Sequence, residues 1–213
     1  MKVLILAAIA ASASGCFMHM GSGTPGSGKL VTEDRKVSGF TKVECKIGAD
    51  VDVVAGKEFS MKLNIDDNLA KEVETSVEKG TLVIRSKSHI DPSKCTISIT
   101  LPAIDGFELD GAGDITIAGV ESKTFAAQID GAGDMTISGT ADEAVLGIDG
   151  AGTIKAYELK TREATAKIDG AGDIQVSAGA ALAAFIDGAG SIRYKGEAKV
   201  TQDIDGAGSV SKG

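Results

Sequence analysis

Apolar and polar residues alternate on both sides of a tetrapeptide, Asp-Gly-Ala-Gly, that the chain repeats six times. The residue before each motif Asp is aliphatic: Leu109, Ile129, Ile148, Ile168, Ile186 and Ile204. Five residues after the Asp an apolar side chain recurs in every copy: Ile115, Met135, Ile154, Ile174, Ile192 and Val210. Because most neighbours of these positions are polar, the pattern predicts strands with one buried face. Each repeat therefore contains one strand that enters the motif and one that leaves it.

The spacing of the motif predicts the architecture. Its copies begin at Asp110, Asp130, Asp149, Asp169, Asp187 and Asp205, so one repeat spans 18–20 residues. Two strands and two turns fit this length, and such a period is typical of stacked repeats. We expect an all-β fold, a β-solenoid whose coils turn at the Asp-Gly-Ala-Gly corners. Glycine allows positive φ angles there, and we expect the alanine to fill the tight inner side of the corner. A hairpin barrel or sandwich is the alternative, but a sandwich seldom keeps one corner sequence through six copies.

The N-terminal region, residues 36–104, lacks the motif but alternates in the same way. Residues 68–73 are the one stretch of this region that fits a short helical turn. We expect the region to be a set of strands continuous with the repeat solenoid over 105–213. The clearest strands are expected at 40–47, 81–86 and 94–102.

The start of the chain is typical of an export signal. A basic residue precedes an apolar run from Val3 to Ala11, which is too short to span a bilayer, and small residues lead from there to Cys16. We therefore predict a signal peptide over 1–15, lipidation of Cys16, and a flexible, glycine-rich tether over 16–35. Cleavage after Ala13, without lipidation, is the competing interpretation.

This interpretation predicts an exported lipoprotein, anchored in the outer membrane and facing either the periplasm or the cell surface. It also bears on the three cysteines, an odd number for an exported chain. If Cys16 is acylated, Cys45 and Cys95 remain, and both fall on the inward side of their strands. In an oxidising compartment these two are candidates for a disulfide. The alternative is that both are small, buried, apolar side chains.

The charge of the chain is concentrated in the repeats. Net charge is −8, and residues 105–213 carry 9 Lys and Arg against 18 Asp and Glu. Such a surface repels phosphates, which argues against nucleic acid as a partner. The six motif aspartates from Asp110 to Asp205 form a column, and we hypothesise that this column binds Ca²⁺ with help from Asp114, Asp134 and Asp173. The alternative is that each motif aspartate bonds its own backbone in an Asx turn. No other cofactor is predicted.

The chain offers little material for a catalytic site. It has two histidines and no tryptophan, and neither His19, in the predicted tether, nor His89, beside Ile90-Asp91-Pro92, faces an obvious base or nucleophile partner. No spacing fits a zinc site, a Ser-His-Asp set or a phosphate loop. Carbohydrate-cleaving β-helices use paired carboxylates and aromatic platforms, whereas the only tyrosines here are Tyr157 and Tyr194, and Tyr194 faces inward. We therefore predict that the protein is not an enzyme.

Three segments carry a resemblance to a known family: FTKVECKIGADVDVVAG, ISITLPAIDGFELDGAGDITIAG and IDGAGSIRYKGEAKVTQDIDGAGSV. In their order and spacing they resemble the bacterial envelope proteins described as "putative auto-transporter adhesin, head GIN domain", from the region of residue 36 to the C-terminus. In that family the corner is commonly Gly-Ser-Gly preceded by Ser, so the corner in this chain is more acidic. The resemblance implies a β-helical fold similar to that of pectin lyases but without their catalytic residues, and a role in adhesion. It implies no particular functional residues.

Together these observations predict a non-enzymatic, lipid-anchored binding or scaffold module of the cell envelope, with an unknown protein or glycan as ligand. A carbohydrate-active β-helix enzyme is one alternative. A cation-stabilised, self-assembling envelope protein is another, because the ends of a solenoid offer unpaired backbone groups to a second copy.

Overall fold

The computed structural model describes residues 23–213, which form an all-β fold with one short 3-10 helix, η1 (Ala70–Glu72). The strands are β1 (Thr24–Pro25), β2 (Leu30–Arg35), β3 (Lys42–Cys45), β4 (Asp50–Ala55), β5 (Ser60–Asp66), β6 (Val73–Glu78), β7 (Thr81–Ser86), β8 (Ile90–Asp91), β9 (Cys95–Leu101), β10 (Gly106–Leu109), β11 (Ala112–Ile129), β12 (Ala132–Lys195), β13 (Lys199–Gly206) and β14 (Ser209–Lys212). The three strands predicted most clearly before the repeats are confirmed as β3, β7 and β9, and η1 lies within the predicted helical turn.

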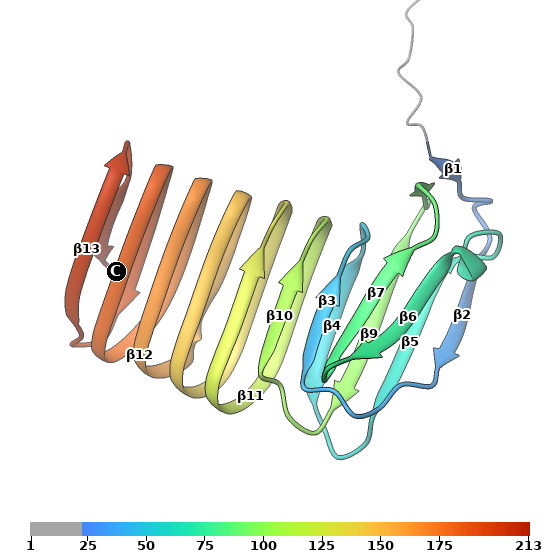
Figure 1. Cartoon of the computed structure of the whole chain (residues 1–213), viewed down its shortest axis with the longest axis horizontal. Helices are drawn as coiled ribbons and strands as arrows, with labels where there is room; N and C mark the ends of the chain where they lie inside the picture. The colour runs from blue at the N-terminus through green and yellow to red at the C-terminus, as the bar shows by residue number, and fades with distance from the viewer. Residues whose placement is uncertain (1–22) are drawn as a thin grey trace, which may run out of the picture.

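Apart from β1 and β8, the strands belong to one sheet of twelve, and they run parallel through the repeats (Figure 1). β10 pairs with β3 on one side and with β11 on the other, while β11 pairs with β4 and with β12. Successive repeats meet in register, since Ile117 lies opposite Ile137 and Ile129 lies opposite Ile148. Residues one repeat apart in the sequence are therefore neighbours in space.

The sheet is nearly closed around a single core. Its strand order is β2-β5-β9-β4-β11-β10-β3-β7-β6, and β11 joins the two sides because its first half pairs with β4 and its second half with β10. The aliphatic residues predicted to face inward are buried from Leu109 to Ile186, and Ile204 in β13 is half-buried. Burial of each such side chain stabilises the fold by about 1.5–3 kcal/mol. The alternating pattern thus predicted the buried face correctly.

Antiparallel strands cover the N-terminal end of this arrangement. β7 and β9 extend the parallel strands β3 and β4; then β6 pairs antiparallel to β7, β5 antiparallel to β9, and β2 antiparallel to β5. The β6–β7 reversal uses a tight turn in which Lys79 and Gly80 have φ angles of 50° and 81°. Because β3 and β4 pair directly with β10 and β11, the N-terminal region and the repeats share one sheet and one core.

The repeated motif separates strands in its first, second and last copies, where β10 gives way to β11, β11 to β12 and β13 to β14, but it does not interrupt the strand in the other three. β12 runs from Ala132 to Lys195 without a break and contains three complete copies of the motif. Within them Gly150, Gly170 and Gly188 have φ angles of 132°, 121° and 121°, so the chain changes direction there while pairing with its neighbour continues (Figure 1). The expectation that alanine fills the inner side of the bend is wrong. The motif alanines are all exposed: Ala112, Ala132, Ala151, Ala171, Ala189 and Ala207.

Glycine is required at the bend because the backbones of successive repeats approach closely. A Cβ atom on Gly170 would lie 2.6 Å from the carbonyl oxygen of Gly150, and one on Gly172 would lie 2.7 Å from that of Gly152. Both distances are well inside van der Waals contact, so a side chain would push the strands beyond their usual spacing of about 4.8 Å. From the second copy to the fifth, both glycines of the motif meet their counterparts in the preceding copy. In the sixth copy Gly206 still does so, whereas Gly208 meets the side chain of Ile186.

The segment predicted as a flexible tether over 16–35 is held in place from Gly23 onward, so that prediction is wrong for residues 23–35. β1 pairs with β8, and β2 pairs with β5. Next to these strands the buried carboxylate of Asp66 accepts hydrogen bonds from the backbone N–H of Gly28 at 2.7 Å and from the N–H and hydroxyl of Ser93 at 2.8 and 2.7 Å. A buried carboxylate requires such donors. The glycine-rich composition does not reveal partners that are supplied by β5 and the loop before β9.

Candidate functional site

The motif aspartates, from Asp110 to Asp205, lie on the exposed side of the bends. Their contacts are with single side chains: the Gln128 amide donates to Asp130 at 2.6 Å, and the Lys46 ammonium lies 3.8 Å from Asp110. Within residues 23–213 no three His, Cys, Asp or Glu side chains are grouped in a way that could hold a metal ion. Calcium binding by this column therefore gains no support from the described geometry and stays a prediction.

The second set of acids in the predicted cation site is partly neutralised by basic neighbours. Asp114 and Asp134 lie opposite each other on adjacent repeats, and Lys155 Nζ lies 2.8 Å from a carboxylate oxygen of Asp134. The hydrogen bond from Lys155 lowers the pKa of Asp134 and raises that of Lys155. Asp173 lies near Arg193, at 3.9 Å. Asp134 and Asp173 are thus paired with cations of the protein itself, whereas no ion pair within residues 23–213 involves Asp114.

Cys16 lies outside the described residues, and the other two cysteines are buried free thiols. Cys45 ends β3 and contacts the carbonyl oxygen of Ile47 at 3.6 Å, whereas Cys95 begins β9. Burial raises the pKa of Cys45 to about 11, and burial together with the nearby Cys45 raises the pKa of Cys95 to about 12. Both thiols are therefore protonated at neutral pH and are poor nucleophiles. No bond joins the two sulfur atoms within residues 23–213, and the disulfide stays a prediction.

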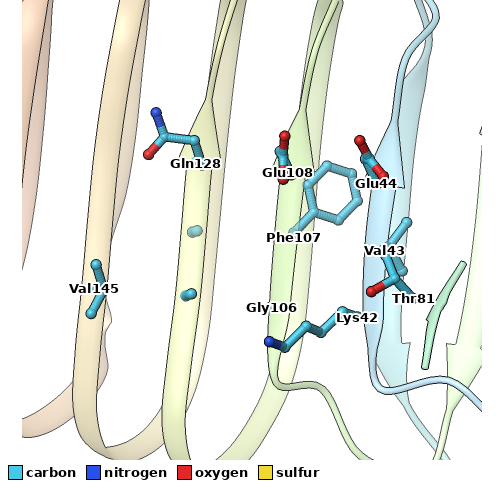
Figure 2. A pocket seen from close by; sticks show the side chains of 11 residues that line it. Lys42, Val43, Glu44, Thr81, Gly106, Phe107, Glu108, Gln128 and Val145 are labelled. Atoms are coloured by element: carbon cyan, nitrogen blue, oxygen red, sulfur yellow. The ribbon is translucent and has the colours of Figure 1, made fainter. Parts of the chain in front are cut away.

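A shallow groove of about 190 Å³ crosses the outer face of β3, β10 and the second half of β11 (Figure 2). Its floor is low because Gly106 and Ala126 stand in register beside Lys42. Glu44 and Glu108 lie side by side along it, and burial, followed by the charge of Glu44, raises the pKa of Glu108. The groove could accept a small group that donates hydrogen bonds. Its lining contains no histidine, cysteine or serine that could act as a nucleophile or base.

His89 lies in a second open cavity, of about 530 Å³, together with Lys46, Arg85 and Ser88. No carboxylate lines this cavity, so the imidazole has no partner of the kind that orients a general base. Tyr157 stacks against the ammonium of Lys195 at 4.2 Å, and Tyr194 packs against the core as predicted. Neither arrangement forms an aromatic platform with paired acids.

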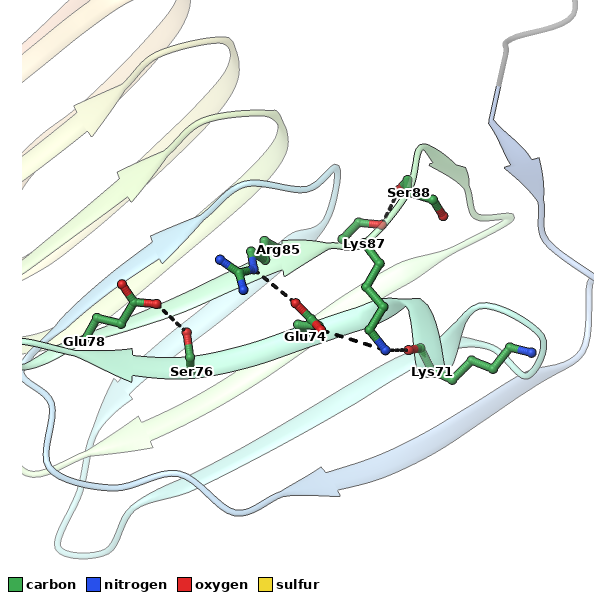
Figure 3. Close-up of polar contacts among 8 residues, drawn as sticks. Lys71, Glu74, Ser76, Glu78, Arg85, Lys87 and Ser88 are labelled. Carbon is green, nitrogen blue, oxygen red and sulfur yellow. Dashed lines mark hydrogen bonds and ion pairs between the residues drawn. The ribbon is translucent and has the colours of Figure 1, made fainter.

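The sequence analysis missed a third surface, which we call the cationic groove: Arg35, Lys71, Arg85 and Lys87. Figure 3 shows the last three of these residues. These side chains come from the end of β2, from η1, from β7 and from the residue after β7, and they line one open cavity of about 410 Å³. No local sequence motif predicts the groove, because the four residues are brought together only by the antiparallel strands at the N-terminal end. Among residues 23–213 there is no helix long and apolar enough to cross a membrane.

These features define an all-β protein that presents open surfaces along a stack of parallel strands. A family model described as "Putative auto-transporter adhesin, head GIN domain" matches residues 39–198, and the chain belongs to this family. The resemblance stated from the sequence is thus confirmed. No curated protein matches the chain.

Three solved structures are similar to this chain in fold. A structure described as a putative adhesin from Bacteroides fragilis NCTC 9343 is 25% identical, with 89% of this chain and 100% of that chain covered and a TM-score of 0.72. One described as a putative lipid binding protein from Parabacteroides distasonis ATCC 8503 is 24% identical over 88% and 98% of the two chains, with a TM-score of 0.51. A putative adhesin from Parabacteroides merdae ATCC 43184 is 20% identical over 89% and 98%, with a TM-score of 0.52.

Proposed function

We propose that this protein is a lipid-anchored module of the bacterial envelope, in which a β-solenoid presents binding surfaces for adhesion and no reaction is catalysed. The observation that carries the proposal is the register of the parallel strands. Ile117 pairs with Ile137, Val120 with Gly139, and Ile186 with Ile204, so equivalent positions of neighbouring repeats stack on one another. This is the pairing that a coil of 18–20 residues produces, and it makes long, flat outer faces rather than an enclosed site.

Adhesion as the purpose of these faces is supported by the family and by its solved members. The family model names an adhesin head domain, and the Bacteroides fragilis relative is described as an adhesin. The three relatives named above carry no enzymatic description. In the cavity of His89 the hydroxyls of Ser86 and Ser88 donate to the Ser88 carbonyl oxygen and to Glu72, not to the imidazole. A rigid stack that exposes a repeated polar surface suits binding to an extended protein or glycan.

The anchor is tested by labelling cells with a clickable fatty acid and isolating the protein. We expect the label on the wild-type chain and on a Cys95→Ser control, and none on Cys16→Ser. Cleavage after Ala13 without lipidation predicts no label on any of the three chains. Label on Cys16→Ser would place the acyl group elsewhere and contradict the assignment of Cys16.

Adhesion is tested by adding protease to intact cells and probing for residues 29–213 with an antibody. Loss of the domain from intact cells supports a surface position and an adhesive role, and binding to host glycans and matrix proteins can then be measured. Survival until the outer membrane is opened would place the domain in the periplasm. That result would replace adhesion by a scaffold role inside the envelope.

A further inference from the structure

The cationic groove contains more hydrogen-bond donors than the protein satisfies. Glu74 is the one acid that lines it; its carboxylate oxygens lie 3.2 Å from Arg85 Nε and 3.9 Å from Lys87 Nζ. No ion pair within residues 23–213 involves Lys71. The Nε of Arg35 is buried, and it has no hydrogen-bond acceptor in the described part of the chain. Glu74 is therefore shared by two cations, and Lys71 has no acidic partner in the groove. The Nη2 of Arg35 pairs with Glu33 at 2.7 Å, so the buried atom of this guanidinium without an acceptor within residues 23–213 is its Nε.

The arrangement of these charges favours a surface over a single small anion. Figure 3 shows the guanidinium of Arg85 and the ammonium groups of Lys87 and Lys71 spread along the groove, with the Lys71 side chain extended away from the other two. The Lys87 ammonium is held in this row because it donates to the carbonyl oxygen of Lys71 at 2.9 Å. A pocket for one phosphate ion brings its donors to one point. A row of cations on an open face instead matches several phosphates that lie in a plane.

The groove lies at the end of the domain where the chain enters from its N-terminal side. Ser27 donates to Asn68 and Asp67, and Lys29 pairs with Asp67, so the entering segment is attached immediately before η1 and Lys71. Six residues lie between Cys16 and Gly23, and the seven Cα-to-Cα steps reach at most about 25 Å even when fully extended. If Cys16 carries the lipid, as the proposed function requires, the groove is within reach of the membrane surface.

The charge of the rest of the molecule reinforces this orientation. Residues 105–213 carry 9 basic and 18 acidic side chains, so an anionic membrane repels the repeats and attracts the groove. The repeats would then point away from the bilayer.

We propose that the cationic groove binds the phosphate groups of anionic phospholipids and so holds the N-terminal end of the domain against the membrane. The anchor limits the distance between domain and bilayer, and the groove determines which end faces the bilayer. The relative described as a lipid binding protein is consistent with this assignment. The inference rests on the proposed lipid anchor for its setting, but the groove can be tested without the anchor.

The test uses residues 16–213 with Cys16→Ser, the mature chain without acylation, in a flotation assay. Vesicles of phosphatidylcholine are compared with vesicles that also contain phosphatidylglycerol. We expect binding only to the anionic vesicles, weakened by added salt. The double variant Lys71→Gln/Lys87→Gln should reduce binding at least about tenfold, since each cation near an anionic surface contributes about fivefold. The matched control Lys160→Gln/Lys199→Gln removes the same charge from the repeats and should leave binding within about twofold.

A change in the opposite direction separates binding from a structural effect. Glu74→Gln releases Arg85 and Lys87 from their shared carboxylate, and it should strengthen vesicle binding about fivefold. If the salt bridges of Glu74 served only stability, this variant would bind no better than the parent chain. The single variant Lys71→Gln, which breaks no ion pair, keeps the test valid if the double variant unfolds.

Three results would overturn the proposal: no preference for anionic vesicles, equal losses in the groove variant and the repeat control, or tight binding of inorganic phosphate alone without binding to vesicles. The last would identify a site for a free oxyanion. Failure of the lipid anchor is a separate result, because fatty-acid labelling of Cys16 reports on the anchor and flotation of the unacylated chain reports on the groove.

Discussion

Substitution of single glycines in the repeats tests the most specific feature of the fold, the close approach of successive backbones. Gly170→Ala adds a Cβ atom 2.6 Å from the Gly150 carbonyl oxygen at a residue whose φ is 121°. Overpacking of this kind costs about 2 kcal/mol, and a non-glycine residue at such a φ costs about 2 kcal/mol more. We therefore expect Gly170→Ala to lower the free energy of unfolding by about 4 kcal/mol, or the melting temperature by on the order of 10 °C.

Three other glycines separate the steric from the conformational contribution. Gly172 meets the Gly152 oxygen at 2.7 Å and is not among the glycines with positive φ, so Gly172→Ala should cost about 2 kcal/mol. Gly39 has a φ of 78° and open space around it, so Gly39→Ala should cost about 1 kcal/mol. A Cβ atom added at Gly179 would lie 3.5 Å from its nearest neighbour, so Gly179→Ala should change the free energy of unfolding by less than about 0.5 kcal/mol.

Urea-induced unfolding at 25 °C, monitored by far-ultraviolet circular dichroism, gives the difference in free energy of unfolding between the wild type and each of the four variants. The order should be Gly170→Ala, then Gly172→Ala, then Gly39→Ala, with Gly179→Ala last. If the two motif variants were no less stable than Gly179→Ala, the neighbouring backbones would lie further apart than described. The motif would then need another explanation.

The remaining predictions concern the buried carboxylate of Asp66, the two thiols and the core. Burial opposes ionisation of Asp66, but hydrogen bonds from the Ser93 hydroxyl and from backbone N–H groups outweigh burial and lower the pKa of Asp66. The ionised carboxylate therefore stabilises the fold fully above the ordinary aspartate pKa, and this stabilisation is lost as the pH falls through the lower pKa of the folded state. Asp66→Asn should melt below wild type at pH 7, and calorimetry at about pH 3 should find the difference reduced; an unchanged difference would contradict the role of the carboxylate. Burial raises the pKa of Cys45 to about 11 and that of Cys95 to about 12, so a disulfide reagent at about pH 8 should label neither cysteine until the chain unfolds. If the chain unfolded without reductant then shows two reactive thiols, the predicted disulfide is excluded; if it shows no reactive thiol, the disulfide is established. Phe125→Ala removes a fully buried ring and should cost about 3–5 kcal/mol in urea unfolding, against less than about 0.5 kcal/mol for the exposed neighbour Thr124→Ala.

Much of the fold could be predicted because the repeat imposes one pattern many times. The inward aliphatic column and the all-β class follow from alternation with a period of two, which survives in every copy of the repeat. The role of the motif alanine was predicted wrongly, because sequence alone does not show which side of a bend faces the core. A positive φ is found at one glycine of the motif in five copies and at neither Gly131 nor Gly133 in the second copy. The close approach to the preceding repeat could not be predicted, because it involves residues about twenty positions apart.

The functional surfaces were less predictable than the fold. The aspartate column was predicted as a cation site because its residues repeat at a nearly constant spacing. Among the described residues, however, no three of these carboxylates are grouped in a way that could hold a metal ion. The cationic groove went unnoticed because Arg35, Lys71, Arg85 and Lys87 follow no period. Residues 23–35 were predicted as a tether since their composition is rich in glycine and polar groups, although a buried aspartate from β5 fixes them.

The all-β class, the family and the inward face of each repeat strand could be predicted from the amino-acid sequence, because they depend on a local alternation that recurs in every copy of the repeat. The folded structure was needed to show where the alanines point, how antiparallel strands cover the N-terminal end and which charges meet there. Those features depend on contacts between segments that are far apart in the chain, and the energy of such a contact cannot be read from either segment alone.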